Sequence, residues 1–478
     1  MKWRAWLAAP IALALGGCDF APRYVPPAVA MGAKFRDQTA DGRTLPASGM
    51  WWLTFNDRTL NALQAQVDAA NPDLAAAVAA NEEAVARANA ALSGAYPQVD
   101  AVPHFLANKQ SAHRPLRSAN QPTYFGDNAL AAQTVYEVDI WGRVRDLVKA
   151  ANLSAEASAD ALADARLELH AELARDYVNL RGFDDEARLF ADTIAIYRSA
   201  LKLTQERLGA KIASPVDVDR AQAQLSSAEA LASDLNLHRA LLEDSIAALV
   251  GKGAASYRIA PSSRPLALPR PPRAVPADVL RNRPDVAESE RLTAAASQTI
   301  GVARANFFPK LSLLALGGTQ DTNVRLFNPQ NLFGTIGPTI DIPLFDAGLR
   351  QAELEVAKAQ FAEAAENYRA TVLRALKEVQ DQLSSLRWLA EEYAQTNTAA
   401  AAARRAADLS LTLYRDGASS YLDVVTAQSA ALDAERLAIA LHTRQLTASI
   451  GLMLALGGGW SAPPEPRAKH GFAPYLAD

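Results

Sequence analysis

Two long stretches of the chain carry apolar side chains at alternating spacings of four and three residues. One stretch runs from Leu180 to Leu201, and the other runs from Phe361 to Tyr393. This spacing places one apolar seam along a helix, as in a coiled coil. No proline interrupts Arg143 to Ile212 or Leu349 to Leu413. We therefore predict one continuous helix over each stretch, roughly 100 Å long at about 1.5 Å per residue.

Each long helix is predicted to end at a short turn and to be followed by a returning helix. Ser214 and Ser420 have the side chain that helix N-caps prefer, and Pro215 suits a first helical position. The pattern predicts two antiparallel helical hairpins, over residues 143–250 and 349–456. A coiled-coil spacer without a pore has the same helical pattern, so the helices alone leave that alternative open.

The two hairpins are copies of one another. RLGAKIASPVDVDRAQAQL (residues 207–225) aligns with LYRDGASSYLDVVTAQSAA (residues 413–431) at a constant offset of 206 residues, the distance from Ser214 to Ser420. One extra residue in a helix rotates everything after it by about 100°, so a gap-free repeat is mostly helical. The same offset relates Gly142 to Gly348, Leu180-Arg181 to Leu386-Arg387, Ala228-Glu229 to Ala434-Glu435, and Gly251 to Gly457.

Shorter segments upstream of each hairpin alternate between apolar and polar or small residues. The clearest are VYEVDI (residues 135–140) and TIGPTIDI (residues 335–342). A membrane-barrel strand alternates in this way, and so does any half-buried strand. Partner strands are predicted at Gln98 to Lys109 and Lys310 to Gln320, which gives strand pairs within residues 98–140 and 309–344. Polar loops are predicted at Gln110 to Asn128 and Asp321 to Asn331.

Four strands per chain cannot form a closed barrel, since single-chain outer-membrane barrels begin at eight. After the first seventeen residues the sequence has no run of eighteen apolar residues, so we expect any membrane crossing to be a closed β-barrel. Two copies would give eight strands around a filled interior, whereas three would give twelve around a bore.

The first seventeen residues have the features of an export signal. Lys2 and Arg4 precede a short apolar run, and Leu15-Gly16-Gly17-Cys18 resembles a bacterial lipobox, which is cut before a cysteine that becomes acylated. Cys18 is the only cysteine, so it has no disulfide partner within the chain. We predict a covalent lipid on Cys18 and no other cofactor. An ordinary signal peptide with a chance cysteine is the alternative.

These features give the following order of segments. The signal peptide is residues 1–17, the lipidated N-terminal segment 18–56, the first repeat 57–251, an equatorial linker 252–276, the second repeat 277–457 and a C-terminal tail 458–478.

Composition narrows the functions that remain. The net charge is −4 and the pI is about 6.0, which argues against a nucleic-acid partner. The six histidines are scattered without metal-ligand spacing, and neither a phosphate-binding loop nor a G-x-S-x-G motif occurs. We therefore expect neither a metal site nor an enzyme.

Several motifs in this order resemble the TolC-like outer-membrane efflux proteins, in particular their lipoprotein branch. They are APRYVPP after Cys18, DIWGRVR (residues 139–145), NRPDVAESERLTAAA (residues 282–296), PLFDAGLR (residues 343–350) and YRDGASSYLDVVTAQ (residues 414–428). The sequence departs from the family at Asp19, which in enteric bacteria holds lipoproteins at the inner membrane, and at Lys211, which replaces the glycine of the second tip.

The resemblance implies a mainly α fold with a transmembrane β-barrel. Three chains would supply four strands each to a twelve-strand barrel in the bacterial outer membrane, continuous with a long periplasmic α-helical barrel. Its partners would be two further copies of the chain, outer-membrane lipid, a periplasmic adaptor protein and an inner-membrane pump. The function implied is passive efflux of drugs or other small molecules, with type I protein secretion as the alternative within the family.

The resemblance also places a periplasmic gate at the hairpin tips. Asp423 would form a ring of three carboxylates, which favours cations, and Tyr414 would help to hold the closed state. The family often has a second carboxylate where Thr426 stands, and Gly417 forms the second turn. Asp217, the repeat mate of Asp423, is interpreted as structural. The alternatives are a solvated helix-start aspartate for Asp423 and simple seam packing for Tyr414.

Overall fold

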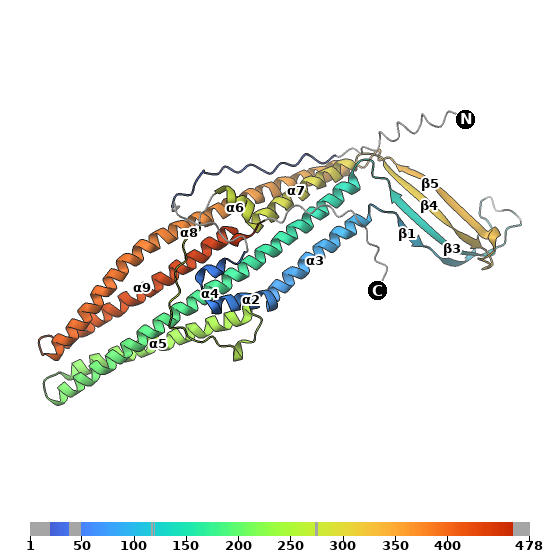
Figure 1. Ribbon diagram of the computed structural model, residues 1–478. Coiled ribbons are helices and arrows are strands. Elements are labelled where there is room, and N and C mark those ends of the chain that lie inside the picture. Colours follow the sequence, from blue (N-terminus) through green and yellow to red (C-terminus); the bar gives the residue numbers. More distant parts are fainter. Residues whose placement is uncertain (1–19, 38–48, 116–117, 119, 273–275, 462–478) are drawn as a thin grey trace. The chain divides into compact units, whose positions relative to one another are not determined.

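The computed structural model describes residues 20–37, 49–115, 118, 120–272 and 276–461 (Figure 1). The chain divides into two compact units, and each takes segments from both sequence repeats. The strand unit comprises Met1–Ala28, Ala80–Ala159 and Glu288–Arg369, and the hairpin unit comprises Val29–Ala79, Asp160–Ala287 and Ala370–Asp478. The compact units are therefore not the two repeats.

The strand unit contains one antiparallel sheet. Its strands are β1 (Gln98–Ala101), β2 (His104–Lys109), β3 (Tyr124–Glu137), β4 (Lys310–Asp321) and β5 (Leu332–Asp341) (Figure 1). The order is β1-β3-β4-β5, and β2 also pairs with β3. The register of β1 continues into β2, from Gln98 opposite Val135 to Lys109 opposite Tyr124. They form one strand interrupted at Pro103, which has no N–H to donate. The four predicted strand positions are thus present.

The predicted loops were wrong at two of their four ends. The predicted loop Gln110 to Asn128 extends too far, because β3 already begins at Tyr124 and pairs with β2 from there. The predicted loop Asp321 to Asn331 overlaps the last residue of β4. Asp127 and Asn128 are polar, so the sequence near the start of β3 resembles a loop. These residues belong to a strand because they pair with segments distant in sequence.

The register gives the sheet one apolar and one mostly polar face, because residues opposite each other on paired strands share a face. The apolar face carries Val99, Phe105, Leu130, Ala132, Tyr136, Leu311, Leu313, Ala315, Leu332, Ile336, Pro338 and Ile340. The other face carries Gln98, Asp100, Gln133, Glu137, Lys310, Ser312, Gln320, Thr335, Thr339 and Asp341, interrupted by Leu106, Phe125, Val135, Leu314, Leu316 and Phe333.

The helical hairpins are α4 (Arg143–Gly209) with α5 (Pro215–Leu249) and α8 (Leu349–Arg415) with α9 (Tyr421–Ala455). The long helices have 67 residues each and the returning helices 35 each, as a gap-free duplication requires. The heptad spacing correctly predicted long uninterrupted helices. Their seams are filled by buried side chains such as Phe190, Tyr197 and Val424.

Shorter helices begin each repeat. In the first repeat these are α2 (Arg58–Ala70) and α3 (Pro72–Ser93), preceded by the short turn η1 (Trp51–Phe55), and in the second they are α6 (Pro276–Asn282) and α7 (Pro284–Ala305). Short turns η2 (Ala254–Ser256), η3 (Pro329–Asn331) and η4 (Gly457–Gly459) complete the elements. Trp51, Leu60 and Val67 pack with Leu173, Tyr177 and Ile450 in the core of the hairpin unit. None of the helices within the described residues is both long enough and apolar enough for a bilayer crossing.

Candidate functional site at the hairpin tips

Both hairpins turn through the same hydrogen-bonded motif. In the first tip, the N–H groups of Lys211 and Ile212 donate to the carbonyls of Leu208 and Arg207, both at 2.9 Å. The second tip repeats this pattern 206 residues later, with Gly417 in the place of Lys211. The arrangement is a Schellman motif, which requires a left-handed residue. Gly417 has a φ of 75° and Lys211 a φ of 62°, so Lys211 adopts the conformation of the missing glycine.

The returning helices begin with matching capping boxes. The Asp423 carboxylate accepts hydrogen bonds from the Ser420 N–H at 3.1 Å and from its Oγ at 2.8 Å. In the first tip, Asp217 accepts from the Ser214 N–H at 3.2 Å and lies 3.7 Å from Arg220. Both aspartates therefore stabilise a helix start. This geometry agrees with the structural interpretation of Asp217 and leaves the gating role of Asp423 a prediction.

Tyr414 lies between the two tips and is only 4% exposed. Its ring lies 5.2 Å from the ring of Tyr421, and the Arg207 guanidinium lies 4.7 Å from its centre. Its hydroxyl has no hydrogen-bond partner within the described part of the chain. Burial, together with the neighbouring Tyr414, raises the pKa of Tyr421 to about 12. Tyr414 thus packs in the seam, and it also contacts the other hairpin.

Arg207 is the tip residue that the sequence did not single out. Its Nη1 donates to the carbonyl oxygens of Tyr414 at 2.7 Å and Arg415 at 3.2 Å. These carbonyls end α8, where no further helical turn follows; the Tyr414 carbonyl also accepts from the Gly417 N–H at 3.1 Å. An arginine in the last turn usually caps its own helix, so only the packing of the hairpins shows that Arg207 caps the other one.

Thr426 is exposed at the start of α9, and its hydroxyl donates to the Leu422 carbonyl at 2.9 Å. It is therefore bonded to its own helix and supplies no second carboxylate at the tip. Cys18 and Asp19 lie outside the described residues. Within the described part of the chain, no group of three or more His, Cys, Asp or Glu side chains is placed to hold a metal ion.

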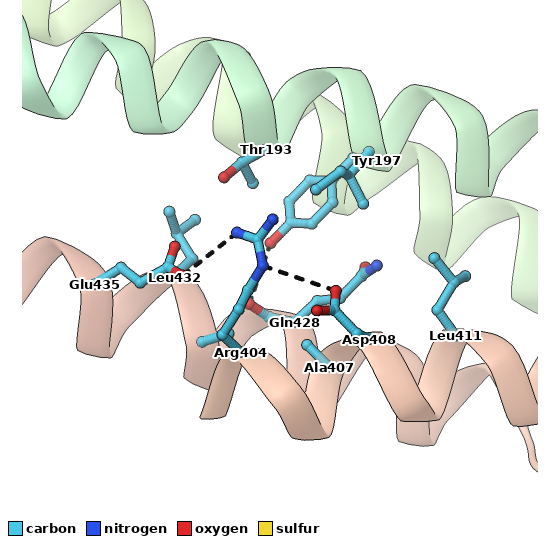
Figure 2. Close-up of a pocket in the computed structure, with 11 residues that line it drawn as sticks. Thr193, Tyr197, Arg404, Ala407, Asp408, Leu411, Gln428, Leu432 and Glu435 are labelled. Atoms are coloured by element: carbon cyan, nitrogen blue, oxygen red, sulfur yellow. Dashed lines mark hydrogen bonds and ion pairs between the residues drawn. The ribbon is translucent and has the colours of Figure 1, made fainter. Parts of the chain in front are cut away.

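A small cavity of about 30 Å³, lined by both polar and apolar side chains, lies between α4, α8 and α9 behind the tips (Figure 2). Its volume suits about one water molecule. Arg404 lies in it, 3.3 Å from Glu435 and 3.7 Å from Asp408. The first repeat has the same pair in Arg198 and Glu229, at 2.9 Å. The cavity is too small for a transported compound, so it belongs to the packing of the helices.

The profile of the outer membrane efflux protein family matches residues 63–252 and 275–458. The chain belongs to this family. The matched segments fall on the two sequence repeats. An outer-membrane location and a role in efflux follow from this membership, and the family is one of channels.

Named relatives cover nearly the whole chain. The antibiotic efflux pump outer membrane protein ArpC of Pseudomonas putida is 28% identical, over 94% of this chain and 94% of its own length. The pyoverdine export outer membrane protein OpmQ of Pseudomonas aeruginosa is 28% identical, over 96% and 97%. The solved structure of the outer-membrane channel OprN is 27% identical, with a TM-score of 0.86 over 93% of this chain and 100% of that chain. The mainly α fold with a strand region is therefore that of an outer-membrane channel.

Proposed function

We propose that three copies of this chain form the exit duct of a tripartite efflux system. The duct passes drugs or other small molecules passively through the outer membrane, and its partners are a periplasmic adaptor and an inner-membrane pump. The names of the relatives support small compounds as the cargo, since ArpC is an antibiotic efflux protein and OpmQ exports pyoverdine.

The apolar face of the sheet carries this proposal. Val99, Ile336 and Ile340 on that face are 63–76% exposed in the single chain. Apolar side chains on a membrane strand face lipid, while the polar face lines the water-filled interior. A sheet with this division of faces fits a wall between lipid and water.

The open edges of the same sheet support a trimer. The β1–β2 strand and β5 form its edges, so each leaves a row of backbone N–H and C=O groups for a partner strand. Four strand positions per chain give twelve in a trimer, and closing them satisfies every backbone group in lipid.

A lipid on Cys18 would enter the membrane beside the ends of the strands. The Phe20 ring stacks on Phe308 at a centroid distance of 4.6 Å, and Trp141 stacks on Phe308 at 4.9 Å. Phe308 stands two residues before β4. Cys18 precedes Phe20 by two residues in the sequence. The covalent lipid on Cys18 would then anchor the chain at the strand ends.

The tips of the second hairpin form the gate in this proposal. Three copies of Asp423 around the axis make a negatively charged constriction that attracts cations. Tyr414 supports the closed arrangement through its contact with Arg207. Gly417 forms the turn, and Thr426 contributes a neutral side chain one turn further on. The duct has no catalytic role, because the pump supplies the energy.

Single-channel recording of the purified full-length protein in a planar bilayer tests the proposal. We expect conductance by a heat-sensitive trimer and partial block by a trivalent cation. Asp423→Asn should weaken the block by at least about tenfold in half-blocking concentration, because it removes three charges from the constriction.

Asp217→Asn is the matched control, since it changes the corresponding capping box of the first tip. It should leave the block unchanged. A monomeric protein without conductance would contradict the duct itself. Equal block of wild type and Asp423→Asn would contradict only the assignment of the gate.

A further inference from the structure

Each hairpin returns to a joint where its last helix meets the start of another helix. At the first joint, Asn71 Nδ2 donates to the carbonyl of Leu249, the last residue of α5, at 2.8 Å. At the second, Arg283 Nη1 donates to the carbonyl of Ala455, the last residue of α9, at 2.9 Å. Both donors directly precede the proline that begins α3 or α7. The two joints are therefore equivalent positions of the duplication.

A glycine allows close approach at each joint. Gly251 and Gly457 have φ values of 68° and 80°, in the left-handed region. A Cβ atom on Gly251 would collide with the carbonyl oxygen of Ala70, and one on Gly457 with that of Asn282. The backbone after each returning helix is thus held directly against the start of α3 or α7.

The two joints differ in charge. Asn71 is neutral, and its Oδ1 caps α3 by accepting from the Leu74 N–H at 2.8 Å. Arg283 forms a two-pronged ion pair with Asp285, at 2.9 and 2.7 Å, and a further ion pair with Glu378 of α8 at 2.9 Å. Glu172 is the repeat mate of Glu378, and it is exposed. The first joint therefore has the glutamate but lacks the arginine.

The ionic joint fixes both helices of the second hairpin at one point. Arg283 is 7% exposed, and it binds the end of α9 and the middle of α8 at the same time. The Arg283 guanidinium is buried while the Glu378 side chain is 41% exposed, so the energy of the joint depends on how closely the arginine meets its carboxylate and carbonyl partners. At the first joint, Asn71 carries no charge and therefore cannot form an ion pair with the corresponding long helix, α4.

The distance from joint to tip makes a small change of angle important. The 37 residues from Glu378 to Arg415 span about 55 Å of helix at about 1.5 Å per residue. A tilt of about 5° at the joint therefore moves the tip by about 5 Å. A shift of that size would separate Tyr414 from Arg207, which are now in contact.

We infer that Arg283, through Asp285 and Glu378, sets the angle of the second hairpin and so holds its tip in the closed position. Arg283 is a positioning residue for the gate. This inference rests on the proposed duct with a gate at the second tip.

Glu378→Gln is the sharpest test, because it weakens the tie to α8 and leaves both the Asp285 pair and the bond to Ala455 intact. Single-channel records of the full-length trimer should show the ratio of open to closed dwell times rise about tenfold, as expected for the loss of one charge-assisted hydrogen bond. Lys377→Gln is the control. It breaks an exposed ion pair with Asp381 one residue away and should leave the ratio unchanged.

A second variant covers the case in which Glu378→Gln fails to assemble. Arg283→Lys keeps one positive charge but loses the planar fork, so it should raise the ratio in the same direction. Assembled trimers with a wild-type dwell-time ratio in these variants would overturn the inference while leaving the duct in place. A silent wild-type protein would overturn the duct and this inference together.

Discussion

At the residue scale, the hairpin unit contains buried and partly buried charges that differ in how many partners they have. Arg181, Asp184, Arg239 and Glu243 form a chain of ion pairs at 2.7–2.8 Å. Asp176 is not part of this chain of ion pairs. Its Oδ2 accepts a hydrogen bond from Ser245 Oγ at 2.5 Å. Burial raises the pKa of the Asp176 carboxyl above its ordinary value of 3.8, against the opposing effects of Ser245 and Arg175.

This raised pKa predicts a pH-dependent effect of Asp176→Asn. The folded state holds the proton to a higher pH than the unfolded chain, so the contribution of Asp176 to stability is full below about 3.8 and falls as pH rises through its folded pKa. The amide does not titrate. The thermal unfolding midpoint of the variant, relative to wild type, should therefore increase from pH 4 to pH 7. A difference that stays constant with pH would contradict this account.

At the element scale, the two tips show that turn geometry is conserved between repeats although the residue is not. Lys211 and Gly417 occupy the same left-handed position, which costs a residue with a Cβ atom about 1–2 kcal/mol. The nearest contact of a Cβ atom on Gly417 would be Arg207 Nη2 at 3.8 Å, so only the backbone conformation opposes a larger residue there.

Exchanging these residues should therefore change stability in opposite directions. Gly417→Ala should lower the free energy of unfolding by about 1 kcal/mol, and Lys211→Gly should raise it by a few tenths to about 1 kcal/mol. Denaturant unfolding of the detergent-solubilised protein measures both. A loss of stability in Lys211→Gly would mean that the lysine side chain makes a contact in the assembled trimer that outweighs its strain.

At the scale of the whole molecule, the two faces of the sheet must meet different solvents. Ile336 and Thr335 are neighbours in β5 whose side chains point to opposite faces, and both are exposed in the single chain. In the proposed trimer Ile336 faces lipid and Thr335 faces water.

Substituting lysine at each position distinguishes a side chain that faces lipid from one that faces water. Ile336→Lys should destabilise the membrane-inserted form by about 2–4 kcal/mol, the cost of a lysine facing the middle of the bilayer, whereas Thr335→Lys should cost little. The yield of heat-sensitive trimers after refolding into lipid vesicles measures the difference. Equal yields would argue that this face does not contact lipid.

The sequence by itself determined the features that depend on neighbours within a few residues. The heptad seam from Phe361 to Tyr393 predicted α8, because side chains three and four apart share one face of a helix. Ser420 predicted the start of α9, because a cap bonds only to the next turn. The ordered motifs, from APRYVPP to YRDGASSYLDVVTAQ, then identified the family by resemblance, and the match of the family profile confirms it.

Only the tertiary structure decided the contacts between distant segments. Arg207 reaches a carbonyl 207 residues away in sequence, and Arg283 reaches one 172 residues away. The start of β3 at Tyr124 depends on its pairing with β2 across a turn. Local pattern specifies which face of an element is buried, but it does not specify which element covers that face. That choice depends on packing the whole chain, and both the cap on the second tip and the ionic joint follow from it.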